Sequence, residues 1–458
     1  MLIAKHLIDK YNQAIPRYTS YPPANFFHQQ FTEADFRESL EQSNSEGESN
    51  ISLYVHIPFC AHKCFYCGCN THITRDQELV SSYLQALKKE IRLMANLVDR
   101  QTRSVSQIHW GGGTPNFLTA EQIADIMELI HSLYTFIPEP EVAIECNPAY
   151  LDYQYIDKLI DLGFNRFSLG VQDFSHEVLN AVKREIPEIP VADLVNHIRR
   201  DGKATVNIDL IYGLPLQNVE QFSQTLDIAL AIRPNRLVTF SYAHLPNINP
   251  NQKGLEKYPM PDAETKLHLL ELAYNKITAA GYLAIGFDHF ALPTDELGSA
   301  IEKHELHRNF QGYCTKRTTG QVLAFGASAI SQLHTAYAQN TKNVTTYISS
   351  INSGKLPIER GYKLSIQDIT VREVINEIMC NLRFSWDNIS AKIGITTQQA
   401  KQQARNAPDE LNNLEADSII EQTDNGLVVT NTGRFFVRNI AACFDPLNRE
   451  NKTYSKTV

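Results

Sequence analysis

Three cysteines lie close enough in this sequence to hold a single soft metal centre. Cys60, Cys64 and Cys67 fall within eight residues, and Cys69 follows two positions later. Crowded thiolates select soft metals, and three of them can hold three corners of a cubane iron–sulfur cluster, which usually takes four. The fourth iron would then stay open to a small molecule. The spacing therefore predicts a 4Fe-4S site with one exchangeable corner.

Two other uses of the cysteines stay open. Together with Cys69 the loop could form a four-thiolate zinc site, although zinc sites usually join two ligand pairs that are a dozen or more residues apart, and no second pair occurs here. A disulfide framework is the other use. The remaining cysteines are scattered singly, and a chain of this length does not need covalent cross-links to be stable. These single cysteines are Cys146, Cys314, Cys380 and Cys443.

The bulk composition limits the class of protein. The chain has 458 residues, of which 43% are hydrophobic and 20% charged, which indicates a soluble globular protein of two or three domains. A net charge of −9 argues against a general nucleic-acid binder. No apolar run of about 18 residues predicts a membrane span. The first residues lack a signal-peptide core, so we expect a cytoplasmic protein, and nothing demands more than a monomer.

Alternating strand and helix patterns surround the cysteine loop. The clearest helix pattern is Thr119–Tyr134, where Thr119 and Gln122 have capping-box spacing and one apolar stripe follows. Repeated strand–helix units require parallel pairing with right-handed crossovers. The fold class is therefore α/β, with a partial (β/α)6 barrel rather than the full eight units. The predicted strands are Leu53–Ile57, Gln107–Trp110, Val142–Cys146, Arg166–Val171, Val206–Ile211 and Leu237–Tyr242.

We expect four divisions along the chain: an N-terminal arm (1–50), the barrel (51–285), an extension with loops for the substrate site (286–362) and a small C-terminal domain (363–458). The arm contains P-R-Y-T-S-Y-P at Pro16–Pro22, which is either a packed segment or a flap that orders over a site. The C-terminal domain combines short helices with a hairpin around D-N-G and resembles a winged helix. Because the protein is acidic, we interpret it as a packing domain rather than a DNA reader.

Polar residues collect where the predicted strands end, which is where parallel barrels carry their chemistry. Glu145, at the end of the third strand, could accept hydrogen bonds from the vicinal hydroxyls of a ribose. Asp209 lies among apolar residues and needs a partner if it is buried. We interpret His62, His72 and His109 as surface or packing residues. The other strand-end groups are Gly111, Gly112, Gly113 and Thr114 after the second strand, Gln172 and Asp173 after the fourth, and Ala243 and His244 after the sixth.

These residues together resemble the radical S-adenosylmethionine superfamily, and more narrowly its oxygen-independent coproporphyrinogen III oxidase family. The C-x-x-x-C-x-x-C loop is the hallmark of the superfamily, and the family motifs extend the match over nearly the whole chain. The resemblance implies a barrel of the radical SAM type. It also implies that a 5′-deoxyadenosyl radical attacks two propionates of coproporphyrinogen III, which become the vinyl groups of protoporphyrinogen IX. The motifs are P-R-Y-T-S-Y-P, Y-V-H-I-P-F-C, W-G-G-G-T-P, N-I-D-L-I-Y-G-L-P, Y-A-H-L-P, H-R-N-F-Q-G-Y (His307–Tyr313) and R-N-I-A-A-C-F-D.

The resemblance further implies roles for single residues. Cys60, Cys64 and Cys67 would hold the cluster, and Cys69 matches a fourth cysteine that is not a ligand. Phe310 and Gln311 match positions implicated in turnover. The first S-adenosylmethionine would contact Tyr54, Tyr66, Gly112, Glu145 and Ile330, with Tyr66 packed on adenine. A second S-adenosylmethionine would contact Gly113, Thr114, Gln172, Arg184, Asp209 and Ala243.

The substrate implied by the resemblance carries four carboxylates, and an electron-donor protein such as a flavodoxin or ferredoxin would be its partner in the reaction. Arg17 and Arg308 are candidates for the carboxylates, because an arginine fork suits such a group. One alternative is a haem chaperone of the same superfamily without oxidase activity. That branch usually lacks the fourth cysteine, the N-terminal arm motif and H-R-N-F-Q-G-Y, and all three are present here. A zinc-stabilised interaction protein is the non-enzymatic alternative.

Overall fold

The structure is a computed structural model that describes residues 4–315, 321–405, 407–449 and 454. It divides into two compact units. We call one the barrel unit, made of His28–Ala273 and Arg317–Lys363, and the other the tail unit, made of Met1–Phe27, Tyr274–Lys316 and Leu364–Val458. The four divisions expected along the chain concern function as well as contacts, and they stay a prediction.

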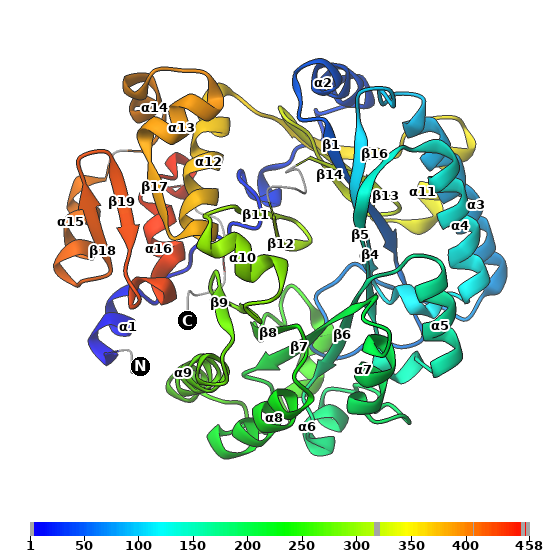
Figure 1. The fold of residues 1–458 in the computed structure, drawn as a ribbon, viewed down its shortest axis with the longest axis horizontal. Helices are drawn as coiled ribbons and strands as arrows, with labels where there is room; N and C mark the ends of the chain where they lie inside the picture. The colour runs from blue at the N-terminus through cyan, green and yellow to red at the C-terminus, as the bar shows by residue number, and fades with distance from the viewer. Residues whose placement is uncertain (1–3, 316–320, 406, 450–453, 455–458) are drawn as a thin grey trace. The chain divides into compact units, whose positions relative to one another are not determined.

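Parallel strands form the barrel unit in the order expected from the sequence (Figure 1). Each predicted strand occurs, and neighbours pair in parallel from β1 to β8. The partial (β/α)6 barrel is therefore confirmed. The strands are β1 (Asn50–Ile57), β4 (Ser104–Gly112), β5 (Phe136–Cys146), β6 (Arg166–Gln172), β7 (Thr205–Tyr212) and β8 (Arg236–Ser241).

The crossover helices lie outside this curved row of strands (Figure 1). In α4 the Thr119 hydroxyl accepts from the Gln122 amide and the Gln122 side chain accepts from the Thr119 amide, which confirms the capping box. Its stripe of Ile123, Ile126, Met127 and Ile130 is buried. The short α6 was not predicted, since six residues are too few to show a helical period. The helices are α3 (Gln77–Ala95), α4 (Ala120–Leu133), α5 (Tyr153–Asp161), α6 (His176–Ala181), α7 (Val191–Arg199) and α8 (Val219–Ile232).

The sheet continues beyond the first strand with segments that the sequence patterns did not reveal. β13 pairs in parallel with β1, and β14, β15 and β16 follow antiparallel to their neighbours. These strands are β13 (Val322–Phe325), β14 (Ile330–Gln332), β15 (Ala336–Asn340) and β16 (Ile358–Lys363). The rest of this unit is α2 (Glu33–Glu46), β2 (Phe59–Cys60), β3 (His72–Ile73), η2 (Pro115–Phe117), η3 (Pro148–Tyr150), η4 (Pro250–Leu255) and α11 (Val344–Asn352), and α9 (Ala263–Ala279) begins in it.

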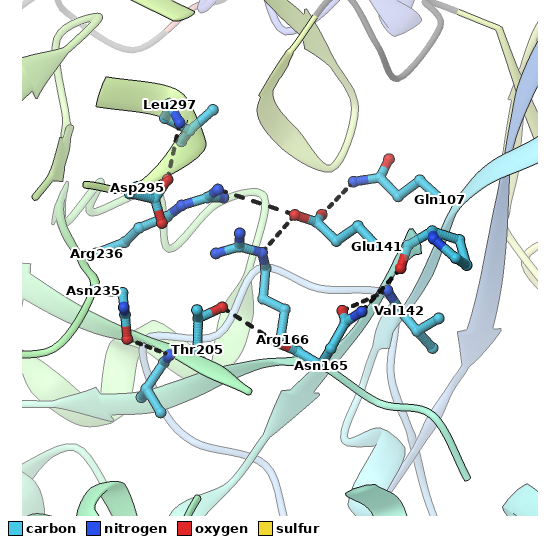
Figure 2. Close-up of polar contacts among 12 residues, drawn as sticks. Gln107, Glu141, Val142, Asn165, Arg166, Thr205, Asn235, Arg236, Asp295 and Leu297 are labelled. Atoms are coloured by element: carbon cyan, nitrogen blue, oxygen red, sulfur yellow. Dashed lines mark hydrogen bonds and ion pairs between the residues drawn. The ribbon is translucent and has the colours of Figure 1, made fainter. Parts of the chain in front are cut away.

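A buried ionic cluster ties three barrel strands together (Figure 2). Glu141 of β5 lies 2.6 Å from Arg166 Nε of β6 and 4.0 Å from Arg236 Nη2 of β8. Gln107 of β4 donates to its other oxygen at 2.6 Å. Burial alone would raise the pKa of Glu141, but the charges of Arg166 and Arg236 outweigh that effect and hold the pKa at about 2. The carboxylate is therefore charged at neutral pH.

The residue before each arginine of this cluster is an asparagine whose side chain bonds to the backbone of the preceding strand. The Asn165 side-chain oxygen accepts from the Val142 amide at 2.9 Å, and that of Asn235 accepts from the Val206 amide at 3.0 Å (Figure 2). The same two-residue sequence, asparagine then arginine, thus opens β6 and β8. It supplies a hydrogen-bond acceptor to the backbone of the previous strand and a cation to Glu141.

The tail unit holds the N-terminal arm against the last helices of the chain. The hydroxyls of Tyr18 and Tyr21 donate to the two oxygens of Asp445 at 2.9 and 3.0 Å, and Arg438 Nε donates to the Pro16 carbonyl at 3.1 Å. Both tyrosines are fully buried, so this segment is packed on its own unit. The arm begins with α1 (Lys5–Tyr11) and η1 (Ala24–Phe26), and it packs near η5 (Gly433–Phe436), α16 (Val437–Ala442) and η6 (Pro446–Arg449).

Helices and small sheets make up the rest of the tail unit. The predicted hairpin occurs as β18 (Ile420–Thr423) and β19 (Gly426–Val429), and β17 (Arg383–Ser385) pairs with β19. This three-stranded sheet with its helices fits the winged-helix-like prediction. The helices are α12 (Ile366–Asn381), α13 (Trp386–Ile393), α14 (Thr397–Gln403) and α15 (Pro408–Ala416). Two further hairpins, β9 (Leu283–Ile285) with β10 (His289–Ala291) and β11 (Leu306–Asn309) with β12 (Gly312–Thr315), flank α10 (Glu296–Glu302).

None of the helices in the described residues combines the length and the apolar character that a membrane crossing needs.

Candidate active site at the strand ends

A cavity of about 170 Å³ lies at the carboxyl ends of the barrel strands. It brings together most of the barrel residues to which the sequence assigned chemistry. The predicted residues that line it are Cys60, Cys64, Tyr66, Cys67, Cys69, Gly112, Gly113, Thr114, Glu145, Gln172, Arg184 and Asp209. Because these side chains come from different parts of the chain, the fold itself assembles the site.

The cysteine loop is anchored at both ends. It leaves the barrel through β2, whose residues Phe59 and Cys60 pair in parallel with His72 and Ile73 of β3. Cys60 Sγ lies 3.3 Å from Thr114 Oγ1, which follows the glycine run of β4. Cys64 Sγ lies 3.9 Å from a guanidinium nitrogen of Arg184. The loop thus has fixed contacts with two other walls of the cavity.

The thiols of the loop differ in their readiness to ionise. Burial raises the pKa of Cys60 to about 11 and also raises the pKa of Cys64. A hydrogen bond from Cys69 lowers the pKa of Cys67 to about 6, against the opposing effect of burial. Metal centres bind thiolates, so loading this loop must release protons from Cys60 and Cys64. Arg184 and Lys63 are the nearby positive charges that favour the thiolates.

The donor set fits a cubane cluster. Cys60, Cys64 and Cys67 line one cavity, and every cysteine in the chain is a free thiol. Among the described residues, no group of three or more His, Cys, Asp or Glu side chains is arranged around a single ion. A single ion needs all its ligands within about 2.3 Å, whereas a cubane offers each sulfur a separate iron and so spreads the sulfurs further apart.

Each glycine of the G-G-G run is needed for a different close approach. A Cβ on Gly111 would lie 2.8 Å from the Glu145 carboxylate, and one on Gly113 would lie 2.7 Å from the Pro58 carbonyl. Gly112 has φ +113°, and a Cβ there would lie 2.7 Å from the ring of His56. A side chain at Gly111 would therefore displace Glu145, which lines the cavity, and one at Gly112 or Gly113 would displace the groups next to the cysteine loop.

Glu145 is held by a histidine that the sequence analysis had interpreted as packing. His109 Nε2 lies 2.9 Å from Glu145 Oε1, and its ring stacks on Tyr54 with centroids 6.0 Å apart. The Tyr54 hydroxyl in turn lies 3.1 Å from His56 Nδ1. Burial lowers the pKa of His56 to about 4, so this imidazole is neutral at physiological pH. Two consecutive strands thereby orient one carboxylate at the edge of the cavity.

A β-bulge turns Gln172 into the site. The register of β6 against β7 shifts between Gly170 and Gln172, and Gln172 has a φ of 73°, an unfavourable value for a residue with a side chain. Gly170 makes room for two polar groups, because a Cβ there would lie 2.8 Å from the Gln172 amide and 3.0 Å from Arg184. Strain at this point is consistent with a binding role for Gln172.

Arg184 retains an unused donor. One of its terminal nitrogens donates to the Gly170 carbonyl and the other contacts Cys64 Sγ, while its buried Nε has no hydrogen-bond partner within the described part of the chain. A buried guanidinium without a counter-ion is costly unless a ligand supplies one. Arg184 therefore points to an anionic group in the cavity.

Asp209 has the partners that the sequence analysis required. Ser168 donates to one of its oxygens at 2.9 Å and Asn207 donates to the other at 2.8 Å. Ser168, which lines the cavity, was not predicted because a serine on a strand carries no signal of its own. Asp209 is thus oriented by its own strand and by the preceding one.

Some predicted residues do not line the cavity. Tyr54 supports it through His109, whereas Ile330 opens β14 and pairs with Gln339. The Ala243 carbonyl, just after β8, accepts from the Gln252 side chain at 3.1 Å. Arg17, Arg308, Phe310 and Gln311 all belong to the tail unit.

His62 is another residue that the sequence analysis assigned to packing. Its Nε2 lies 3.9 Å from Cys64 Sγ and donates to the Lys183 carbonyl at 3.2 Å, and its Nδ1 lies 3.2 Å from Glu185 Oε1. His62 therefore links the cysteine loop to the segment that carries Arg184. No sequence pattern distinguishes it from an ordinary surface histidine.

Comparison with known proteins identifies the family to which this site belongs. Residues 54–229 match the family description "Radical SAM superfamily". The oxygen-independent coproporphyrinogen III oxidase of Synechocystis sp. is 43% identical over 96% of this chain and 94% of its own length. That of Helicobacter pylori is 36% identical over 98% of both chains. The solved coproporphyrinogen III oxidase of Escherichia coli, described as a radical SAM enzyme, superimposes with a TM-score of 0.88 at 39% identity, over 95% of this chain and all of that one.

Proposed function

This chain belongs to the oxygen-independent coproporphyrinogen III oxidase family of radical SAM enzymes, and on that premise we propose how its residues divide the reaction. It is an oxidoreductase that oxidises coproporphyrinogen III without oxygen and uses a 4Fe-4S cluster and S-adenosylmethionine. The assignment of roles rests on one observation. The cysteine loop, the glycine run, Glu145 and Arg184 all line the same cavity.

Cys60, Cys64 and Cys67 would hold the cluster and leave one iron for the amino and carboxylate groups of a first S-adenosylmethionine. When bound, the cluster would supply the electron that cleaves S-adenosylmethionine to a 5′-deoxyadenosyl radical, and the protein would supply position and exclusion of water. Glu145, fixed by His109, is oriented to accept from the ribose hydroxyls. The Tyr66 hydroxyl is bonded to the Cys64 thiol, which leaves its ring face for adenine. Tyr54 and Ile330 are the other positions that we assign to this molecule.

A second S-adenosylmethionine would contact the residues at the ends of β6 and β7. Arg184, with its unused buried donor, suits the carboxylate of this molecule. Asp209, held by Ser168 and Asn207, suits its amino group or hydroxyls. Gly113, Thr114, Gln172 and Ala243 complete this part of the site.

The proposal predicts that Arg184→Lys binds one S-adenosylmethionine per chain where the wild type binds two. A lysine cannot offer the two parallel donors of the guanidinium. Anaerobic equilibrium dialysis with labelled S-adenosylmethionine gives the stoichiometry, and the cluster absorption shows whether the metal centre survives. Arg92→Lys, on the exposed face of α3, is the control. Two molecules bound to Arg184→Lys would refute the role.

The propionates of the substrate would meet Arg308 and Arg17 of the tail unit. Arg308 is buried, and its Nε has no hydrogen-bond partner within the described residues. Its Nη1 donates to the Arg17 carbonyl at 3.4 Å, which is a long contact. A buried guanidinium with unused donors is suited to a carboxylate ligand. Phe310 and Gln311, in the turn that follows Arg308, are proposed to contact the substrate during turnover.

The remaining assignments concern the cellular setting. We place the enzyme in the cytoplasm as a monomer, reduced by an electron-donor protein such as a flavodoxin or ferredoxin. The net charge of −9 and the free thiols agree with that setting.

The test is anaerobic reconstitution with iron and sulfide, followed by incubation with S-adenosylmethionine, dithionite and coproporphyrinogen III. The expected result is 5′-deoxyadenosine together with a divinyl product, detected by mass spectrometry. Cys64→Ala should lose the cluster absorption and both products. Adenosyl cleavage without vinyl product would favour a haem chaperone, and a colourless protein with bound zinc would favour an interaction protein.

A further inference from the structure

Glu90 of α3 is a buried carboxylate that the sequence analysis did not single out. The residue is only 2% exposed. Its Oε1 accepts from the Asn340 side-chain amide at 2.7 Å, and its Oε2 accepts from the Gly326 backbone amide at 2.8 Å and from the Tyr347 hydroxyl at 2.6 Å. A buried polar group is costly unless hydrogen bonds compensate it, and here donors from three later segments of the chain do so.

The Gly326 amide belongs to a strained turn, residues 326–329, between β13 and β14. Gly326 has φ +104°, and Ser328 has φ 65°, a value that a residue with a side chain rarely adopts. Asn340, which donates to Glu90, also donates to the Gly326 carbonyl at 2.9 Å. Glu90 therefore holds the first residue of this turn directly by its amide and, through Asn340, by its carbonyl.

A second side chain of α3 binds the same turn. The hydroxyl of Tyr83, two helical turns before Glu90, donates to the His56 carbonyl at 2.7 Å and accepts from the Ala327 amide at 3.0 Å. A Cβ on Gly326 would collide with this hydroxyl, so only glycine leaves room for the bridge. α3 therefore ties the turn to the end of β1.

The turn lies at the edge of the sheet that carries the cavity. β13 pairs in parallel with β1, so the carboxyl end of β13 adjoins the strand end that leads to the cysteine loop. Ser328 Oγ lies 3.4 Å from His56 Nε2, and His56 Nδ1 lies 3.1 Å from the Tyr54 hydroxyl. The turn ends at Ile330, the first residue of β14. Tyr54 and Ile330 are the two positions assigned to the first S-adenosylmethionine that do not line the cavity.

We propose that Glu90 is a positioning residue for the first S-adenosylmethionine, because it holds the turn that leads to Ile330. Through Ser328 and His56 the same turn sets the place of Tyr54. The proposal rests on the proposed function, which assigns these two positions to the molecule. Glu90 does not line the cavity and takes no part in making or breaking a bond.

The test titrates the cluster site without turnover. Reconstituted enzyme is reduced with dithionite, mixed anaerobically with increasing S-adenosylmethionine and frozen at once, and the change in the electron paramagnetic resonance spectrum of the cluster reports binding at the open iron. The titration is run at about pH 8.5, because burial raises the pKa of Glu90 to about 7 and the carboxylate must be charged.

Glu90→Gln should raise the concentration of S-adenosylmethionine at half of the spectral change about 5- to 20-fold. The glutamine keeps the shape, but its NH₂ group cannot accept, so at least one of the three donors loses its acceptor. Tyr347→Phe keeps the carboxylate and removes a single donor, so it should raise the same concentration about two- to fourfold.

The control is Glu141→Gln, which also removes a buried carboxylate from the barrel unit but lies away from the cavity. This variant should be less stable to heat and still keep the half-change concentration within about twofold of the wild type. If Glu90→Gln does not fold, as judged by thermal melting, Tyr347→Phe decides.

A wild-type titration in folded Glu90→Gln, or in Tyr347→Phe where that variant decides, would overturn the proposal. An equal rise in Glu141→Gln would also overturn it, because the loss would then follow from a general loosening of the unit. Failure of the proposed function looks different, since the wild type itself would show no spectral change with S-adenosylmethionine or would form no vinyl product from coproporphyrinogen III.

Discussion

At the scale of single residues, the cavity depends on side chains that hold other side chains in place. Glu145 and Asp209 are obvious carboxylates in the sequence, but their orientation depends on His109, Ser168 and Asn207. The sequence could not separate His109 from a packing histidine, because one polar residue on a buried strand looks the same in either role. The parallel register pairs His109 with Ala143 and so places His109 near Glu145, which makes His109 a partner of this carboxylate.

We predict that His109→Phe weakens binding of S-adenosylmethionine about 3- to 10-fold, which corresponds to one hydrogen bond of about 1 kcal/mol. The phenyl ring keeps the contact with Tyr54 but cannot bond Glu145. Equilibrium dialysis on the reconstituted protein measures the affinity, and His131→Phe on α4 is the matched control, since its ring faces Phe136. Unchanged affinity would show that Glu145 needs no partner.

At the scale of elements, the six parallel strands and their long helices followed from periodicity and from caps that act locally. β13 to β16 did not, because strands of three to six residues are too short for a clear alternation, as the segment A-F-G-A-S-A-I-S-Q at β13 and β14 shows. The cysteine loop and the glycine run were predicted together because each follows a strand. Ile330 in β14 came only from the resemblance, whereas Ala243 after β8 was also expected from its place at a strand end.

The Glu141 cluster is an element-scale feature that no local pattern reveals, since its arginines come from two later strands. We predict that Glu141→Gln lowers the free energy of unfolding by about 3–5 kcal/mol at pH 7, because it leaves buried guanidinium groups without this counter-charge. Urea denaturation followed by tryptophan fluorescence measures the change. A loss below about 1 kcal/mol would show that the cluster contributes little to the free energy of unfolding.

The same variant has a defined pH dependence. The pKa of Glu141 is about 2 in the folded state, below its usual value, so its contribution is complete above pH 5 and disappears as the pH falls towards 2. The difference in unfolding free energy between wild type and Glu141→Gln should therefore shrink by about 3 kcal/mol over that range. Glu121→Gln is the control, because its ion pair with Lys158 is on the surface and is screened by water. A difference that does not vary with pH would show that Glu141 is not the titrating group.

At the scale of the whole molecule, the proposed electron-donor protein would approach a chain with a net charge of −9. Lys183 lies in the left-handed region at φ 54°, with its ammonium 4.5 Å from the Phe65 ring of the cysteine loop. Lys63 is close enough to favour the Cys67 thiolate by its charge. These lysines form a small basic area beside the cluster loop on a chain with a net charge of −9.

We predict that the double variant Lys63→Glu, Lys183→Glu slows cluster reduction by a reduced flavodoxin at least 10-fold at low salt, since electrostatic steering of an acidic donor is lost. Stopped-flow absorbance of the cluster measures the rate. Reduction by dithionite should stay within about twofold of the wild type, and Lys401→Glu on α14 should have no effect. Equal slowing with both reductants would mean that the cluster itself was damaged.

The trio of Glu141, Arg166 and Arg236 also limits how this barrel can change. Replacing Glu141 alone leaves two buried guanidinium groups without this counter-charge, and replacing one arginine removes a charge that holds Glu141 ionised, whereas replacing all three by apolar residues of similar volume can leave stability intact. Descendants of this chain should therefore alter these positions jointly or not at all. An engineer who reshapes the cavity mouth can vary β5, β6 and β8 near their carboxyl ends while the opposite ends stay interlocked.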